Sequence, residues 1–154
     1  MKKILCMDWG GTFMKYALMD EEGKILSSSK VKSPGKGDSK EVLLSCLDKI
    51  VYSFEDIDGI AISSAGVIDS ANGVIEAIGI FPYLNGCAVC EELQERYKVK
   101  VTIENDARCA LGAEVWKGNL QDVQDGAVVV IGTGIGTALF LDGKVRGGVH
   151  HLAG

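Results

Sequence analysis

Two short glycine-rich segments contain the residue types that can hold a phosphate chain. Residues 8–12 follow an apolar run near the N-terminus, and residues 132–137 follow the apolar run 128–131. Glycine lets the backbone approach an anion closely, so main-chain N–H groups can point at phosphate oxygens, and threonine adds a hydroxyl donor. Either segment alone is equally an ordinary glycine-rich hairpin, but the pair indicates two backbone clamps on one phosphate chain. The expected phosphate contacts are Gly10, Gly11, Thr12, Gly132, Thr133 and Gly134.

Carboxylates stand at the ends of two apolar strands. Asp8 ends the first, where a buried carboxylate is costly unless it binds a cation, so it suits a magnesium-bound water; capping a turn is the alternative role. Asn105 and Asp106 stand where a later strand gives way to a helix, a favoured place for ligands in open α/β sheets. A carboxylate there can take the proton of a hydroxyl that attacks phosphorus, whereas the alternative is a simple helix N-cap.

Other polar residues offer hydrogen bonds to a polyol. Ser63, Ser64 and Gly66 follow a predicted strand, and a plain turn explains them equally well. His150 and His151 are the only histidines; either can bind a sugar hydroxyl or remain a solvated loop residue. Ser64, Gly66 and His150 are therefore candidate substrate-binding residues.

The elements expected to position these residues form a repeating pattern. Three opening strands are followed by alternating helices and strands, and a second glycine hairpin then restarts the pattern. The Ala-Asn-Gly sequence at 71–73 predicts a hairpin turn. Strands are expected at residues 3–7, 15–20, 24–31, 57–63 and 100–104 and as a pair over 127–141, and helices at about 39–53, 91–97 and 105–116.

Composition limits the possible partners and surroundings. The 154 residues are 47% apolar with a net charge of −5, so a hydrophobic core is expected and no basic surface attracts nucleic acid. No apolar run approaches the roughly 20 residues of a membrane span. An odd number of cysteines, five, suits a reducing cytoplasm. Cys87 and Cys90 form an isolated C-x-x-C, which we interpret as structural or incidental rather than as half of a zinc site or a redox pair.

Three segments together resemble the ROK family of sugar kinases, repressors and related proteins, within the actin-like ATPase superfamily. They are Asp8-Trp9-Gly10-Gly11-Thr12, Glu104-Asn105-Asp106-Ala107 and Ile131-Gly132-Thr133-Gly134-Ile135-Gly136. The resemblance implies an α/β, ribonuclease-H-like fold with two domains, ATP and Mg²⁺ between the glycine hairpins, and a hexose at the interdomain face. It also implies that Asp106 is the catalytic base, that Asn105 and Gly66 contact the sugar, and that Asp8 lies at the metal.

The resemblance predicts an incomplete domain organisation. Residues 1–117 are expected to form the N-terminal domain and residues 118–154 the first strands of a second ATPase domain. The family's Gly-Glu-x-Gly-His sugar motif stops here after its first glycine, Gly154. Its cysteine-rich zinc motif and its adenine-binding part are also missing from the sequence. We therefore expect a fragment that is inactive alone, with any zinc site beyond residue 154.

The predicted function is ATP-dependent phosphorylation of a hydroxyl group on a hexose or an N-acetyl amino sugar. The expected partners are the sugar and ATP, with a homodimer left open and neither nucleic acid nor membrane expected. The alternatives are a non-catalytic sugar-sensing or transcriptional-regulator-type ROK module and an actin-like ATPase without a sugar acceptor. Only three residues precede the first apolar run, which leaves no helix-turn-helix there and favours the kinase.

Overall fold

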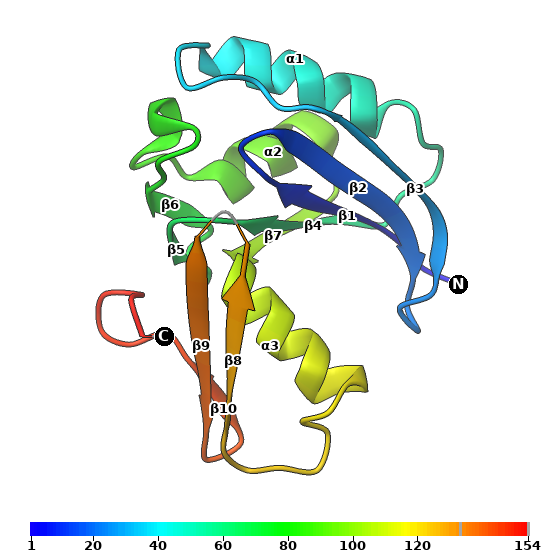
Figure 1. Ribbon diagram of the computed structural model, residues 1–154. Helices are drawn as coiled ribbons and strands as arrows, with labels where there is room; N and C mark the ends of the chain where they lie inside the picture. The colour runs from blue at the N-terminus through cyan, green and yellow to red at the C-terminus, as the bar shows by residue number, and fades with distance from the viewer. Residues whose placement is uncertain (133, 154) are drawn as a thin grey trace. The chain divides into compact units, whose positions relative to one another are not determined.

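A computed structural model describes residues 1–132 and 134–153, and these form two compact units that divide between Ile103 and Glu104 (Figure 1). Helix α3 (Asp106–Lys117) belongs to the second unit, together with the strands that follow it. The domain boundary expected after residue 117 therefore differs from the boundary between the compact units, and it stays a prediction.

The first unit is built on a sheet whose strands lie in the order β3-β2-β1-β4-β7. Its strands are β1 (Lys3–Trp9), β2 (Phe13–Asp20), β3 (Ile25–Lys32), β4 (Gly59–Ser64) and β7 (Lys100–Asn105). Strand β1 pairs antiparallel with β2 and parallel with β4. Because β1 and β4 run in the same direction, the polar residues at their carboxyl ends lie at one edge of the sheet.

One face of this sheet packs against the helices α1 (Lys40–Val51) and α2 (Val89–Tyr97), as Figure 1 shows. Leu43, Leu47 and Ile50 form an apolar stripe on α1 and are buried. Side chains alternate across a strand, so the burial of Leu5, Met7 and Trp9 against the helices directs Cys6 and Asp8 to the opposite face. The core of the first unit thus fixes the face on which Asp8 lies.

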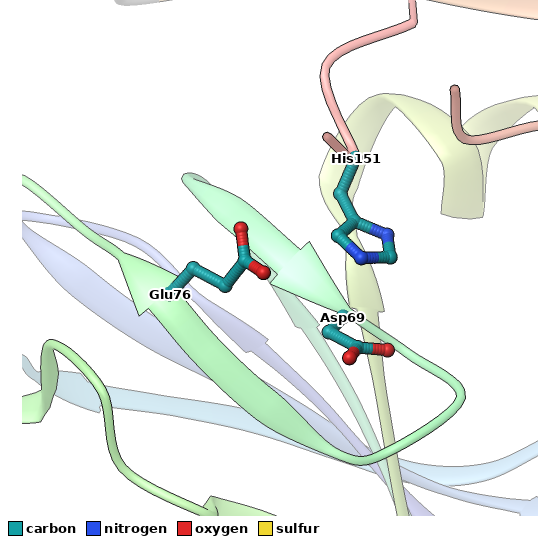
Figure 2. Close-up of side chains that lie close together, drawn as sticks. All are labelled: Asp69, Glu76 and His151. Carbon is teal, nitrogen blue, oxygen red and sulfur yellow. The ribbon is translucent and has the colours of Figure 1, made fainter. Parts of the chain in front are cut away.

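A small hairpin follows β4 and confirms the turn predicted at 71–73. It consists of β5 (Val67–Asp69) and β6 (Val74–Ala77), and Gly73 takes a φ of 69° at the turn. The side-chain amide of Asn72 donates a 2.7 Å hydrogen bond to Asp69 and closes the turn. Asp69 and Glu76 lie on the two strands of this hairpin (Figure 2). A short 3₁₀ helix (Pro82–Leu84), which the sequence analysis did not predict, comes next.

The second unit packs α3 against a sheet in the order β10-β9-β8. The strands are β8 (Gly126–Ile131), β9 (Ile135–Leu141) and β10 (Lys144–Arg146). Ala107, Leu111, Ala138 and Phe140 form its buried core. No helix in the described parts of the chain is long and apolar enough to cross a membrane.

The expected order of elements is confirmed, with shifts of one or two residues at most boundaries. Strand β1 continues to Trp9 rather than ending at residue 7, so Asp8 lies inside the strand and pairs across from Lys15 and Ser63. The predicted glycine hairpin between β8 and β9 is also present, because Ile131 pairs with Ile135.

Candidate functional site

Asp8 lies on a partly exposed face beside a cavity of about 580 Å³. The Ser63 hydroxyl donates a 3.3 Å hydrogen bond to Asp8 Oδ1, and the Lys15 ammonium lies 3.6 Å from Asp8 Oδ2. The side chains of Lys15 and Asp8 are 68% and 47% exposed, so this ion pair is weak and leaves the carboxylate accessible. An accessible carboxylate oxygen beside a hydroxyl and a cation fits a magnesium-bound water near phosphates.

The turn after β1 is tight, and its first position, Gly10, requires glycine. A Cβ on Gly10 would lie 2.7 Å from the carbonyl oxygen of Phe13, so no larger residue fits there. The N–H of Gly10 donates to the carbonyl of Asp8 at 3.2 Å. The N–H groups of Gly11 and Thr12 have no hydrogen-bond partner in the described part of the chain. Two unused donors beside a carboxylate fit the predicted phosphate clamp.

The second glycine turn joins β8 to β9 in the other unit. The N–H of Gly132 donates a 2.9 Å hydrogen bond to the carbonyl of Gly134, and both glycines have open space where a Cβ would stand. Thr133 lies outside the described residues. The open backbone is compatible with close approach of an anion, and the roles of Gly132, Thr133 and Gly134 stay predictions.

Asn105 and Asp106 have different structural roles at the start of α3. The side-chain oxygen of Asn105 accepts hydrogen bonds from the N–H groups of Ala107 at 3.0 Å and Arg108 at 3.3 Å, so Asn105 is the N-cap. Asp106 is the first helical residue and is half-buried; its Oδ1 accepts a 2.8 Å hydrogen bond from the N–H of Ala107. The second carboxylate oxygen of Asp106 is therefore the better candidate for a substrate proton.

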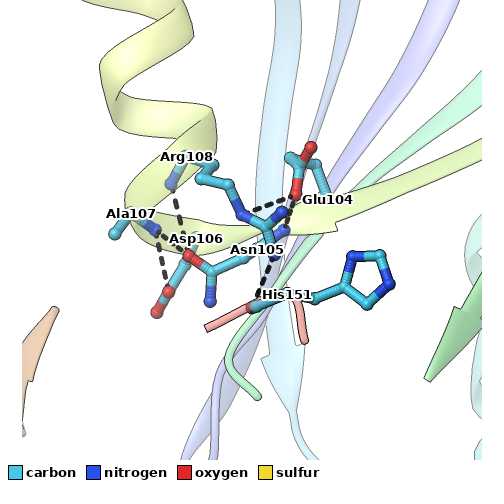
Figure 3. A network of polar contacts seen from close by, with 6 residues as sticks. All are labelled: Glu104, Asn105, Asp106, Ala107, Arg108 and His151. Carbon is cyan, nitrogen blue, oxygen red and sulfur yellow. Dashed lines mark hydrogen bonds and ion pairs between the residues drawn. The ribbon is translucent and has the colours of Figure 1, made fainter. Parts of the chain in front are cut away.

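A polar network that the sequence analysis missed supports this helix start (Figure 3). Glu104 Oε1 accepts a 2.7 Å hydrogen bond from the N–H of Asn105 and lies 3.1 Å from Arg108 Nε. Arg108 is 7% exposed, and its guanidinium donates at 3.4 Å to the carbonyl oxygen of His151. Arg108 therefore links the N-cap to the segment 147–153. The spacing of Glu104 and Arg108, four residues apart across a helix start, was the signal that could have revealed the pair.

The structure separates the two neighbouring serines of β4. Ser64 is completely buried on the core side and its hydroxyl donates to the carbonyl of Ala65 at 3.2 Å, so it cannot reach a sugar in this conformation. Ser63, which faces Asp8, is the better-placed hydroxyl. The substrate-binding role of Ser64 stays a prediction.

The sugar-binding roles expected for Gly66 and His150 stay predictions. Gly66 has a φ of 108°, and a Cβ there would collide with the carbonyl of Ala77, which gives a structural reason for glycine. The side chain of His150 is exposed.

The C-x-x-C pair is part of the first unit's packing. All five cysteines are free, and burial raises the pKa of the Cys90 thiol. Cys87 Sγ lies 4.0 Å from the Lys40 ammonium. Among the described residues, no group of three metal-ligating side chains includes Cys87 or Cys90.

Comparison with known proteins gives the class to which this arrangement belongs. Residues 4–154 match the ROK family. The chain is 34% identical over 152 residues to the β-glucoside kinase of Klebsiella pneumoniae, covering 99% of this chain and 50% of that protein. The chain thus spans about half the length of the curated relatives it matches.

Two solved structures are similar over nearly the whole chain. The ROK family glucokinase from Streptomyces griseus, in complex with glucose and AMPPNP, has a TM-score of 0.85 at 26% identity, covering 98% of this chain and 48% of that one. A ROK family transcriptional regulator, described as a homologue of the E. coli MLC protein, has a TM-score of 0.87 at 26% identity, covering 99% and 40%. The chain belongs to the ROK family and has its α/β, ribonuclease-H-like fold.

Proposed function

We propose that this chain is the phosphate-binding and base-bearing part of an ATP-dependent sugar kinase. The observation that carries the proposal is the glycine turn beside Asp8, which offers unused N–H donors next to an accessible carboxylate. A phosphate chain is bound well by such donors together with a divalent cation. The similarity to a β-glucoside kinase and to a glucokinase bound to glucose and AMPPNP supports ATP and a hexose as the substrates.

The proposed roles follow from the chemistry of phosphoryl transfer. Asp8 holds a metal-bound water, and the N–H groups of the turn at Gly11 and Thr12 bind phosphate oxygens. The magnesium ion, when bound, neutralises charge on the transferred phosphoryl group. Asp106 accepts the proton of the sugar hydroxyl through the carboxylate oxygen that the helix N–H does not occupy, and Ser63 and Asn105 hydrogen-bond the sugar. A cytoplasmic location also remains a prediction.

The test is sugar-dependent consumption of ATP. Because the chain spans about half of its relatives, the assay uses a chimera in which it replaces the matching half of the Klebsiella β-glucoside kinase, beside the chain alone. A panel of glucose, N-acetylglucosamine, N-acetylmannosamine and a β-glucoside identifies the acceptor. We expect ADP release only with an acceptor sugar and only from the chimera. ATP hydrolysis that is indifferent to every sugar would instead indicate an ATPase.

A second candidate function is a sugar sensor of the transcriptional-regulator type. The similarity to a ROK family regulator at a TM-score of 0.87 favours it, since the same fold serves both kinds of protein. Calorimetry separates the two functions: a sensor binds sugar at micromolar to millimolar concentrations without consuming ATP. The retention of both Asp8 and Asp106 favours the kinase.

A further inference from the structure

Ser33 directly follows β3 and lies against the turn between β1 and β2. Its hydroxyl donates a 2.6 Å hydrogen bond to the carbonyl of Gly10, and its backbone N–H donates a 3.1 Å hydrogen bond to the carbonyl of Thr12. Ser33 is 8% exposed, so water competes little for these bonds. One residue from elsewhere in the sequence therefore holds both ends of the glycine turn.

The bond to Gly10 determines which way the next N–H points. The described chain contains no cis peptide bond, so the carbonyl of Gly10 and the N–H of Gly11 point to opposite sides of their shared peptide. Since the carbonyl is directed at Ser33, the N–H of Gly11 is directed away from Ser33. A hydrogen bond accepted by the carbonyl also polarises the peptide and strengthens its N–H as a donor.

We infer that Ser33 is a positioning residue for nucleotide phosphate binding: it orients and polarises the Gly10–Gly11 peptide so that the Gly11 N–H donates to a phosphate oxygen. This inference rests on the proposed function, which supplies the nucleotide. Ser33 acts only through the turn, because its hydroxyl proton is already given to Gly10.

The experiment follows the Gly11 amide by ¹⁵N NMR while MgATP is added to the chimera with the Klebsiella β-glucoside kinase. The variants are Ser33→Ala, which removes the hydroxyl, and Ser33→Thr, which keeps it. Ser53→Ala is the matched control, because the Ser53 hydroxyl makes a similar 2.7 Å bond to the carbonyl of Ile50 at the end of α1. We expect Ser33→Ala to weaken MgATP binding by roughly 3- to 10-fold, the effect of one net hydrogen bond, and to reduce the Gly11 shift.

The other variants and a ligand-free measurement complete the test. Ser33→Thr and Ser53→Ala are expected to bind MgATP like the unmodified chimera. Without nucleotide, Ser33→Ala is expected to increase fast motion of the Gly11 N–H, which the loss of the Ser53 bond does not change. Equal MgATP affinity and an equal Gly11 shift in Ser33→Ala would overturn the inference and leave the kinase proposal standing. Absence of MgATP binding by the unmodified chimera would overturn both.

Discussion

Asn105 and Asp106 are neighbours, yet the structure gives their side chains different tasks. The oxygen of Asn105 caps α3 with two hydrogen bonds, whereas Asp106 uses one oxygen for the helix, and the other is the one proposed to accept the sugar's proton. A base that is also anchored to its own helix has few orientations open to it, which favours repeated proton transfer in one geometry.

Replacing Asp106 tests the proposed base. Asp106→Asn keeps an acceptor oxygen for the N–H of Ala107, so the helix start should remain intact. In the chimera we expect kcat to fall by about a hundredfold or more, with the KM for ATP nearly unchanged, because general-base catalysis contributes at least that much. A coupled ADP assay measures both constants. Undiminished kcat would contradict the assignment.

Replacing Asn105 separates capping from sugar binding. Asn105→Ala should lower the free energy of unfolding by about 0.5–2 kcal/mol, the usual cost of losing an N-cap, as measured by urea denaturation. Asn105→Asp keeps the capping oxygen but loses the amide donor. We expect Asn105→Asp to preserve stability while raising the KM for the sugar. An unchanged KM for the sugar would mean that Asn105 caps α3 and does not bind the sugar.

At the scale of elements, α1 and α2 are joined by a polar cluster on the edge of the core. Arg96 of α2 makes two hydrogen bonds to the Asp48 carboxylate of α1, at 2.7 and 2.5 Å, and the Tyr97 hydroxyl donates to the same carboxylate at 3.0 Å. The Arg96 hydrogen bonds lower the pKa of Asp48, while burial and the bond to Asp48 raise the pKa of Tyr97. This cluster fixes the two helices that cover the Asp8-bearing sheet.

The lowered pKa of Asp48 predicts how this cluster responds to pH. A carboxylate whose folded pKa lies below its ordinary value of 3.8 adds stability above that pH and loses it as the pH falls through the folded pKa. Asp48→Asn should therefore reduce the free energy of unfolding at about pH 7, by about 1 kcal/mol or less because the groups are partly exposed. As the pH falls from 3.8 through the folded pKa of Asp48, the difference between the two proteins in urea denaturation should shrink toward zero. A constant difference across this range would contradict the prediction.

The elements were predictable because their patterns are local. The apolar stripe on α1 and the glycine hairpins gave the order of the predicted elements; boundaries such as that of β1 moved, and the short 3₁₀ helix (Pro82–Leu84) was missed. The site was less predictable. Which of Ser63 and Ser64 faces Asp8 depends on the register of β1 against β4, and the burial of Arg108 depends on packing that a sequence pattern does not contain.

At the scale of the whole molecule, each compact unit carries part of the proposed machinery. The first unit contains Asp8 and its turn, and the second contains Asp106 and the glycine turn between β8 and β9. Two units of one chain therefore have to fold correctly before the proposed activity can be assembled. In the second unit, Arg108 is the residue that holds the N-cap and the segment 147–153 together.

Arg108→Met tests whether this unit depends on the network. The change keeps much of the side-chain volume but leaves Glu104 without its cation, and breaking a buried ion pair costs up to about 3–5 kcal/mol. We expect a smaller loss of unfolding free energy, because the side chain of Glu104 is 34% exposed. Limited proteolysis should cleave within residues 147–153 faster than in the unmodified chain. Lys117→Met, at the far end of α3, is the control and should leave this cleavage unchanged.

The hydrogen bond from Ser33 to the glycine turn also implies an order of events while the chain is being synthesised. Ser33 stands 23 positions after Gly10, so a nascent chain that has exposed only β1 and β2 lacks the group that orients the turn. The turn gains its two hydrogen bonds from Ser33 only when β3 has left the ribosome and paired with β2. If the chain binds nucleotide as proposed, the first hairpin alone should bind it more weakly than the sheet that includes the third strand.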